Sequence, residues 1–136
     1  MSRKTAREVA MKLAFARLFG GEDTYEAILE KSGINEKPTE DDMSYSDQVI
    51  RGIEEHGTEL DEKIAELAIG WSIDRMPRVD LSILRVAIYE MLYMDAIPSS
   101  VSINEAVELA KRFGGEKSSS YINGMLGTLA KQTGKE

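Results

Sequence analysis

The sequence predicts an all-α fold, and three features of the chain support this. Apolar residues recur at the three- and four-residue spacing of an amphipathic helix in successive segments. Clusters of glycine, proline and serine separate these segments, as helix ends and connecting loops require. Alternating strand patterns, internal repeats and low-complexity tracts are not found. At 136 residues the chain has the size of one domain, or of two small halves that share a core.

The segment 79–95 carries the broadest apolar arc of the sequence. A helix here presents apolar side chains over about half of its circumference, so it should lie in the core and contact several neighbouring helices. A narrow polar strip of Ser82, Arg85 and Tyr89 runs opposite this arc, and it is the part of the helix expected to meet a ligand. Glu90 lies at the margin of the arc, where a solvated carboxylate is more common than a buried, paired one.

Two helices are predicted near the N-terminus. The first should span about Arg3–Phe19 and end at a pair of glycines. The second should span about Thr24–Lys31, with Asp23 and Glu26 at the spacing of a capping box.

The next stretch should contain a loop and then a longer helical region. Residues 33–44 are acidic, lack a pattern and include a proline, which indicates a mobile loop. A helix should begin at Ser44 or Ser46, kink or break at Gly57, and continue to an inward-facing Trp71.

Two more helices should follow the central segment. Ser102 and Glu105 have the spacing of a capping box and should begin a helix that ends at Gly114. The serines at 118–120 should cap the last helix.

The net charge of −7 is unevenly distributed along the chain. Residues 1–21 contain five basic residues and one acid, whereas residues 22–66 contain 15 acids and four basic residues. Several of the cations fall at the start of the first helix, where the helix dipole is positive and a cation is mildly unfavourable. This placement suits an anion such as phosphate, but a basic end that only keeps the chain soluble is equally compatible with it.

The residues needed for several kinds of chemistry are missing. The chain has no cysteine, which excludes disulfides, thiolate metal sites and cysteine nucleophiles. His56 is the only histidine and should be solvated, and no Glu-x-x-His pair occurs. We therefore expect no enzyme, with no catalytic residues, cofactor or metal site. Signal-peptide and membrane-spanning patterns are also missing, so we expect a cytoplasmic protein that does not bind membranes.

Basic side chains near aromatic rings favour a surface for single-stranded RNA, because cations bind the backbone and flat rings stack on unpaired bases. The candidates come from the first helix and from the turn between the last two helices: Arg3, Lys4, Arg7, Phe113, Lys117 and Tyr121. An acidic helical adaptor that binds only proteins is the rival interpretation. A helical enzyme with a carboxylate-bound metal is disfavoured by the missing Glu-x-x-His pair.

Several long motifs resemble the NusB family of transcription antitermination factors. They include Ile-Asn-Glu-Ala-Val-Glu-Leu-Ala-Lys-Arg-Phe-Gly at 103–114 and Tyr-Ile-Asn-Gly-Met-Leu at 121–126, together with segments 71–80 and 83–91 and the Ala-Arg-Glu motif that starts at Ala6. The resemblance covers essentially the whole chain. It implies one NusB-like domain over residues 1–136, built as two small helical bundles packed around a central helix. The N-terminal helical half would span about 1–72 and the C-terminal half about 73–136.

The resemblance also implies partners and sites. The family pairs with NusE, a small-ribosomal-subunit protein, and binds the boxA element of nascent RNA. The assembly then helps RNA polymerase to read through terminators, notably in ribosomal RNA operons. By position, the RNA-binding residues would be Arg3, Lys4, Arg7, Phe113, Lys117, Ser120 and Tyr121, and the NusE-facing residues would be Phe15, Asp74 and Asp80. The N-terminus has fewer arginines than is common in the family, which implies weaker intrinsic RNA binding, and the extra base at 117 would partly offset this.

Overall fold

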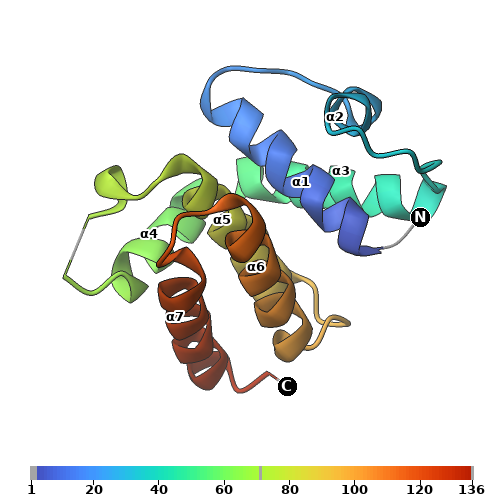
Figure 1. Ribbon diagram of the computed structural model, residues 1–136. Helices are drawn as coiled ribbons and strands as arrows, with labels where there is room; N and C mark the ends of the chain where they lie inside the picture. The colour runs from blue at the N-terminus through green and yellow to red at the C-terminus, as the bar shows by residue number, and fades with distance from the viewer. Residues whose placement is uncertain (1–2, 71, 136) are drawn as a thin grey trace.

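The computed structural model describes residues 3–70 and 72–135, and in this part of the chain helices joined by loops are the only regular secondary structure (Figure 1). Trp71, which we expected to face the core, lies outside the described residues. The helices are α1 (Arg3–Leu18), α2 (Tyr25–Lys31), α3 (Glu40–Glu55), α4 (Gly57–Leu67), the short 3-10 helix η1 (Ile73–Arg75), α5 (Arg78–Tyr93), α6 (Ser99–Phe113) and α7 (Ser118–Thr133). The all-α prediction is confirmed. Among the described residues, no helix combines the length and the apolar character needed to cross a membrane.

The central helix α5 organises the core, as the sequence predicts. It packs against α1, α3, α4, α6 and α7, while α1 also packs on α3, and α6 packs on α7. In Figure 1, the α1–α3 pair and the α6–α7 pair lie on different sides of α5. Leu84 and Ile88 of α5 are completely buried between these neighbours.

Most of the polar strip of α5 is covered by other helices, and of its three residues only Arg85 lines a surface hollow. Ser82 is completely buried and donates to the carbonyl oxygen of Arg78. Arg85 makes two hydrogen bonds to Asp61 of α4, at 3.0 and 2.8 Å. Tyr89 is buried under α3. Because other helices pack on this side of α5, Ser82 and Arg85 bond within the protein.

Two predicted starts in the N-terminal part are corrected. Thr24, and not Asp23, caps α2, because its Oγ1 accepts the backbone N–H of Ala27 at 3.2 Å. Thr39 caps α3 in the same way, so that helix begins at Glu40 and shortens the predicted loop. Ser46, expected near the helix start, is buried inside α3.

The break predicted at Gly57 is confirmed, and the residue before it is less exposed than expected. His56 separates α3 from α4. Its ring stacks on Tyr93 of α5 with a centroid distance of 4.1 Å, and 27% of its side chain is exposed. The only histidine therefore packs at a helix junction and is not fully solvated.

The predicted starts of the last two helices also change. Helix α6 begins at Ser99, immediately after Pro98. Ser102 consequently lies within the helix, where it donates to Glu90 at 2.9 Å and caps nothing. Ser118 begins α7, and its hydroxyl donates to Asp80 of α5. Both serines stand where the sequence pattern predicts a helix cap. Because α5 lies next to them, their hydroxyl groups instead donate to carboxylates of that helix.

Candidate nucleic-acid interface

The first two cations of α1 point to different helices. The Arg3 guanidinium bonds to Asp41 at 2.6 Å and to Asp42 at 3.1 Å, both in α3. The Lys4 ammonium lies 3.2 Å from Glu105 of α6, and 58% of the lysine side chain is exposed. The structure therefore places Arg3 on the α3 side of α1 and Lys4 on the α6 side, each with a carboxylate partner.

Arg7 was expected to bind RNA, but the structure buries it. Only 6% of the residue is exposed, and its Nε donates to Glu90 at 2.9 Å. Glu90 is itself 1% exposed and also accepts hydrogen bonds from Tyr45 and Ser102. The predicted solvated Glu90 is thus wrong: its carboxylate joins α1, α3, α5 and α6. In this conformation Arg7 has little surface to offer a phosphate.

The buried Arg7 guanidinium remains ionised because it is paired. Burial lowers the pKa of Arg7, but the hydrogen bond and charge of Glu90 outweigh this and leave it above its ordinary value. Burial, followed by the charge of Glu90, raises the pKa of Tyr45 well above its ordinary value. Tyr45 therefore stays protonated and donates to the carboxylate.

A cluster at the end of α6 was only partly foreseen from the sequence. Glu8 of α1 accepts hydrogen bonds from Lys12 at 2.9 Å and from Arg112 at 2.8 Å. The charged groups of Lys12 and Arg112 lie 4.8 and 4.7 Å from the centroid of the Phe113 ring. Phe113, which the sequence predicted, thus has two cations next to its ring. One of them, Arg112, was not predicted. Its position directly before Phe113, in the last turn of a helix, was the available signal.

Glu8 holds the two cations of this cluster in place. Burial alone would raise the pKa of Glu8, but the hydrogen bonds and charges of Lys12 and Arg112 together bring it below its ordinary value. The carboxylate is therefore ionised at neutral pH and fixes both basic side chains beside the ring.

The turn between α6 and α7 presents the remaining RNA candidates. Lys117 and Ser120 are exposed, and Tyr121 is partly buried in the first turn of α7. Lys4 and Lys12 both meet α6, at Glu105 and Phe113. The structure therefore unites Lys4, Lys12, Arg112 and Phe113 along the α1–α6 contact, with Lys117 just before α7 and Tyr121 in its first turn. Arg3 and Arg7 do not belong to this exposed surface.

The residues expected to face NusE are also distributed differently from the prediction. Asp74 of η1 is exposed and lines a hollow of about 240 Å³ together with Leu18 of α1. Phe15 is partly buried, and its ring lies 5.1 Å from that of Phe19, which is 67% exposed. Asp80 is completely buried and has no surface for a partner. Phe19 was not predicted, although two aromatic residues four positions apart on a helix were a usable signal.

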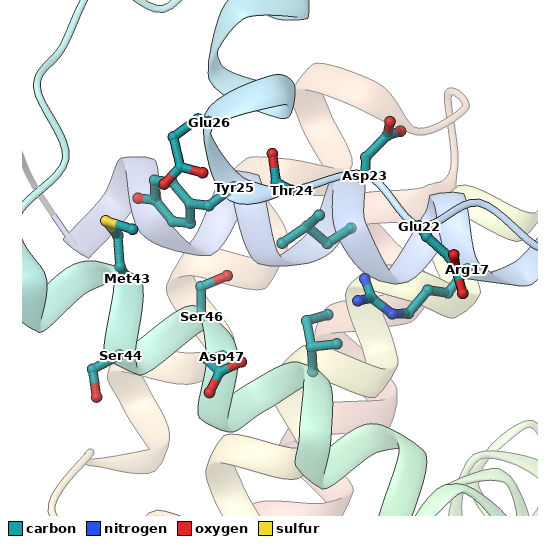
Figure 2. A pocket seen from close by; sticks show the side chains of 12 residues that line it. Arg17, Glu22, Asp23, Thr24, Tyr25, Glu26, Met43, Ser44, Ser46 and Asp47 are labelled. Atoms are coloured by element: carbon teal, nitrogen blue, oxygen red, sulfur yellow. The ribbon is translucent and has the colours of Figure 1, made fainter.

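A second cavity has the wrong charge for nucleic acid. Figure 2 shows this space of about 510 Å³ between α1, the start of α2 and α3. Glu22, Asp23, Glu26 and Asp47 surround it, and Arg17 is the one cation among the lining residues. Since Arg17 is bonded to Glu54 at 2.9 Å, the rim is acidic and would repel phosphate. Over residues 3–70 and 72–135, no group of histidine and carboxylate side chains is placed to hold a metal ion.

The sequence model of the NusB family matches residues 4–131. The chain belongs to the NusB family. The transcription antitermination protein NusB of Clostridium botulinum (strain Kyoto / Type A2) is 42% identical over 142 aligned residues, which cover 95% of this chain and 99% of that protein. The NusB protein of Natranaerobius thermophilus is 44% identical over 137 residues, 99% of each chain. As a family of antitermination factors, NusB proteins are not enzymes.

Solved NusB structures share the fold. The chain is similar to T. maritima NusB with a TM-score of 0.83 and 35% identity, over 97% of this chain and 92% of the other. It also matches a chain in the crystal structure of the antitermination factors NusB and NusE in complex with double-stranded RNA. That match has a TM-score of 0.79 and 25% identity over 96% of each chain.

Proposed function

We propose that this NusB-family chain binds boxA-type single-stranded RNA together with NusE, and that the complex promotes read-through by RNA polymerase in ribosomal RNA operons. The observation that carries the proposal is the row of cations along α1 and α6, where Lys4 and Arg112 are exposed and Lys12 is partly buried, beside Phe113 and the α6–α7 turn. A related NusB has been solved with NusE and double-stranded RNA, which supports NusE and RNA as partners here.

The mixture of cations and rings favours unpaired RNA over a regular duplex. Lys4, Lys12 and Arg112 can bind phosphates of a flexible backbone, because that backbone can approach each of them in turn. Tyr121 offers a partly exposed ring near Lys117 for an unstacked base. Since the bases of a duplex are already stacked, the ring would gain less there. Double-stranded RNA is therefore the proper competitor in a binding experiment.

The salt dependence of RNA binding tests the charged part of this surface. The double variant Lys4→Ala/Lys117→Ala removes two cations that are exposed in the structure. If each neutralises one phosphate of single-stranded RNA, the slope of log K against log salt should flatten by roughly 1.4. The matched control is Lys63→Ala/Lys131→Ala, which changes net charge equally on α4 and the far end of α7.

The variant Tyr121→Ala separates stacking from charge. Loss of a stacking ring should weaken binding by about 1–3 kcal/mol and leave the salt slope nearly unchanged. If the charge variant and Tyr121→Ala both bind RNA like the parent, the basic surface only aids solubility and the chain is a protein-binding adaptor.

NusE is proposed to bind the opposite end of α1, at the hollow near Asp74. Asp74 and the exposed Phe19, backed by Phe15, supply a charge and an apolar contact for a basic ribosomal protein. Asp74→Lys should therefore weaken NusE binding at low salt while RNA binding by the isolated chain stays the same. Unchanged NusE affinity would remove this hollow from the interface.

A further inference from the structure

The start of α7 lacks a side-chain cap, and its first residue is instead hydrogen-bonded to a carboxylate of α5. Lys117 precedes the helix and makes no side-chain capping bond. The Ser118 hydroxyl instead accepts the backbone N–H of Gly115 at 2.9 Å and donates to Asp80 Oδ2 at 2.9 Å. Because a helix N-terminus is partly positive, a carboxylate at this end of α7 also complements its dipole.

This connection is closely packed and has no exposed part. Asp80 is completely buried, and Ser118 is 3% exposed. A Cβ atom added at Gly114 would lie 2.7 Å from the Ser118 Cβ and 2.8 Å from its Oγ, so the turn presses directly against the serine. Asp80 Oδ1 has no hydrogen-bond partner among the described residues. The hydrogen bond from the Ser118 hydroxyl to Oδ2 therefore defines the position of the carboxylate.

We propose that Asp80 is a positioning residue for RNA recognition, acting through Ser118 on the turn between α6 and α7. This turn fixes Phe113 at the end of α6 relative to Lys117 and Tyr121 at the start of α7. The inference rests on the proposed RNA surface, and it replaces the direct contact with NusE that the family resemblance implied for Asp80. A turn held in the binding conformation loses less entropy when RNA binds, so releasing it should reduce affinity.

The test measures two affinities for each variant of the full chain, one for a single-stranded boxA RNA oligonucleotide and one for NusE. Asp80→Ala and Ser118→Ala should each weaken RNA binding about tenfold, the equivalent of one hydrogen bond. The double variant should be no weaker than the worse single variant, because both changes remove the same bond. The salt slope and the NusE affinity should stay at the parent values, since no phosphate contact and no exposed group is lost.

Two further variants make the outcome specific. Asp80→Asn should recover most of the RNA affinity, because its amide oxygen can still accept the Ser118 hydroxyl. Asp95→Ala removes an exposed acid just after α5 and controls for the change in charge. Circular dichroism and thermal melting show whether each variant is folded, and Ser118→Ala carries the test if Asp80→Ala does not fold.

The proposal is overturned if Asp80→Ala and Ser118→Ala bind RNA as the parent does while Tyr121→Ala binds weakly. It is also overturned if Asp80→Ala binds RNA more tightly than the parent, which is the result that loss of a negative charge alone would produce. A third contradicting result is an Asp80→Ala variant that binds NusE more weakly but binds RNA as the parent does. If Tyr121→Ala has no effect either, the RNA surface itself is wrong, and the failure belongs to the proposed function.

Discussion

Each basic side chain at the start of α1 meets a carboxylate from another helix. Asp41 of α3 bonds to Arg3, Glu90 of α5 bonds to Arg7, and Glu105 of α6 bonds to Lys4. The exposed pairs contribute little to stability, because water screens them and the side chains lose freedom. They do matter for binding, since a phosphate has to compete with a carboxylate that is already present.

Arg7→Ala should damage the fold before it affects RNA binding. The change leaves the buried Glu90 carboxylate without its cation, which should cost about 3–5 kcal/mol in the free energy of unfolding measured by urea denaturation. Arg7→Met combined with Glu90→Gln should be more stable than Arg7→Met alone, because the unpaired charge is gone. Equal urea midpoints for Arg7→Ala and the parent would show that this ion pair does not support the fold.

Glu105→Gln should strengthen RNA binding. It removes the charge that holds Lys4 and that lies 3.8 Å from Arg7, and so it frees a cation on the proposed surface. Because Lys4 no longer has to leave a carboxylate to bind a phosphate, affinity should rise while the number of phosphates contacted, and so the salt slope, stays nearly the same. Glu108→Gln, on the same helix but paired with Lys111, is the control for net charge. An equal gain from both variants would mean that only the overall charge matters.

At the scale of helices, one glycine determines how closely α3 approaches α5. A Cβ atom at Gly52 would lie 1.9 Å from Cε1 of Tyr89, so these helices pack backbone against ring. A Cβ atom added at Gly124 in α7 would have nothing within 4 Å. Gly52→Ala should therefore destabilise the protein by about 1–3 kcal/mol through overpacking. Gly124→Ala should stabilise it by about 0.5–1 kcal/mol through helix propensity. Thermal melts that moved in the same direction for both variants would contradict this packing.

The contact between α5 and α7 predicts a pH effect on stability. Burial raises the pKa of Asp80, and the Ser118 hydrogen bond only partly opposes this. The folded protein therefore keeps the carboxyl proton of Asp80 at pH values where the unfolded chain has already lost it. The stabilisation that Asp80 contributes consequently falls as pH rises through its folded pKa. Asp80→Asn does not titrate, so its melting temperature should rise relative to the parent as pH increases above about 4, the ordinary pKa of an aspartic acid. A constant difference over that range would show that Asp80 does not titrate differently on folding.

For the molecule as a whole, α5 makes the two sets of helices interdependent. Leu84 is completely buried where this helix meets its neighbours, and removing most of its side chain leaves a cavity. Leu84→Ala should cost about 2–5 kcal/mol, a large part of the roughly 5–15 kcal/mol that stabilises a typical domain. Val101→Ala, at a residue that is 36% exposed, should have little effect. If Leu84→Ala unfolded at the same denaturant concentration as the parent, α5 would not be the centre of the core.

The sequence by itself determined the helical class, the core position of α5 and the family. Helical periodicity depends on neighbours three and four positions away, so a single chain segment contains the whole signal. It also proposed Lys4 and Lys117, which the structure exposes, but the same reasoning selected Arg7, which the structure buries.

Only the tertiary structure decided which charged and polar side chains are exposed. Arg7 and Glu90 are 83 positions apart, and Ser118 and Asp80 are 38 apart, so no local pattern indicates that they meet. A carboxylate at the edge of an apolar arc is solvated when nothing approaches it, and it is buried when three neighbouring helices bring a cation and two hydroxyl groups, as around Glu90. The burial of Glu90 and Asp80 therefore depended on helix packing, which the sequence pattern of α5 does not contain.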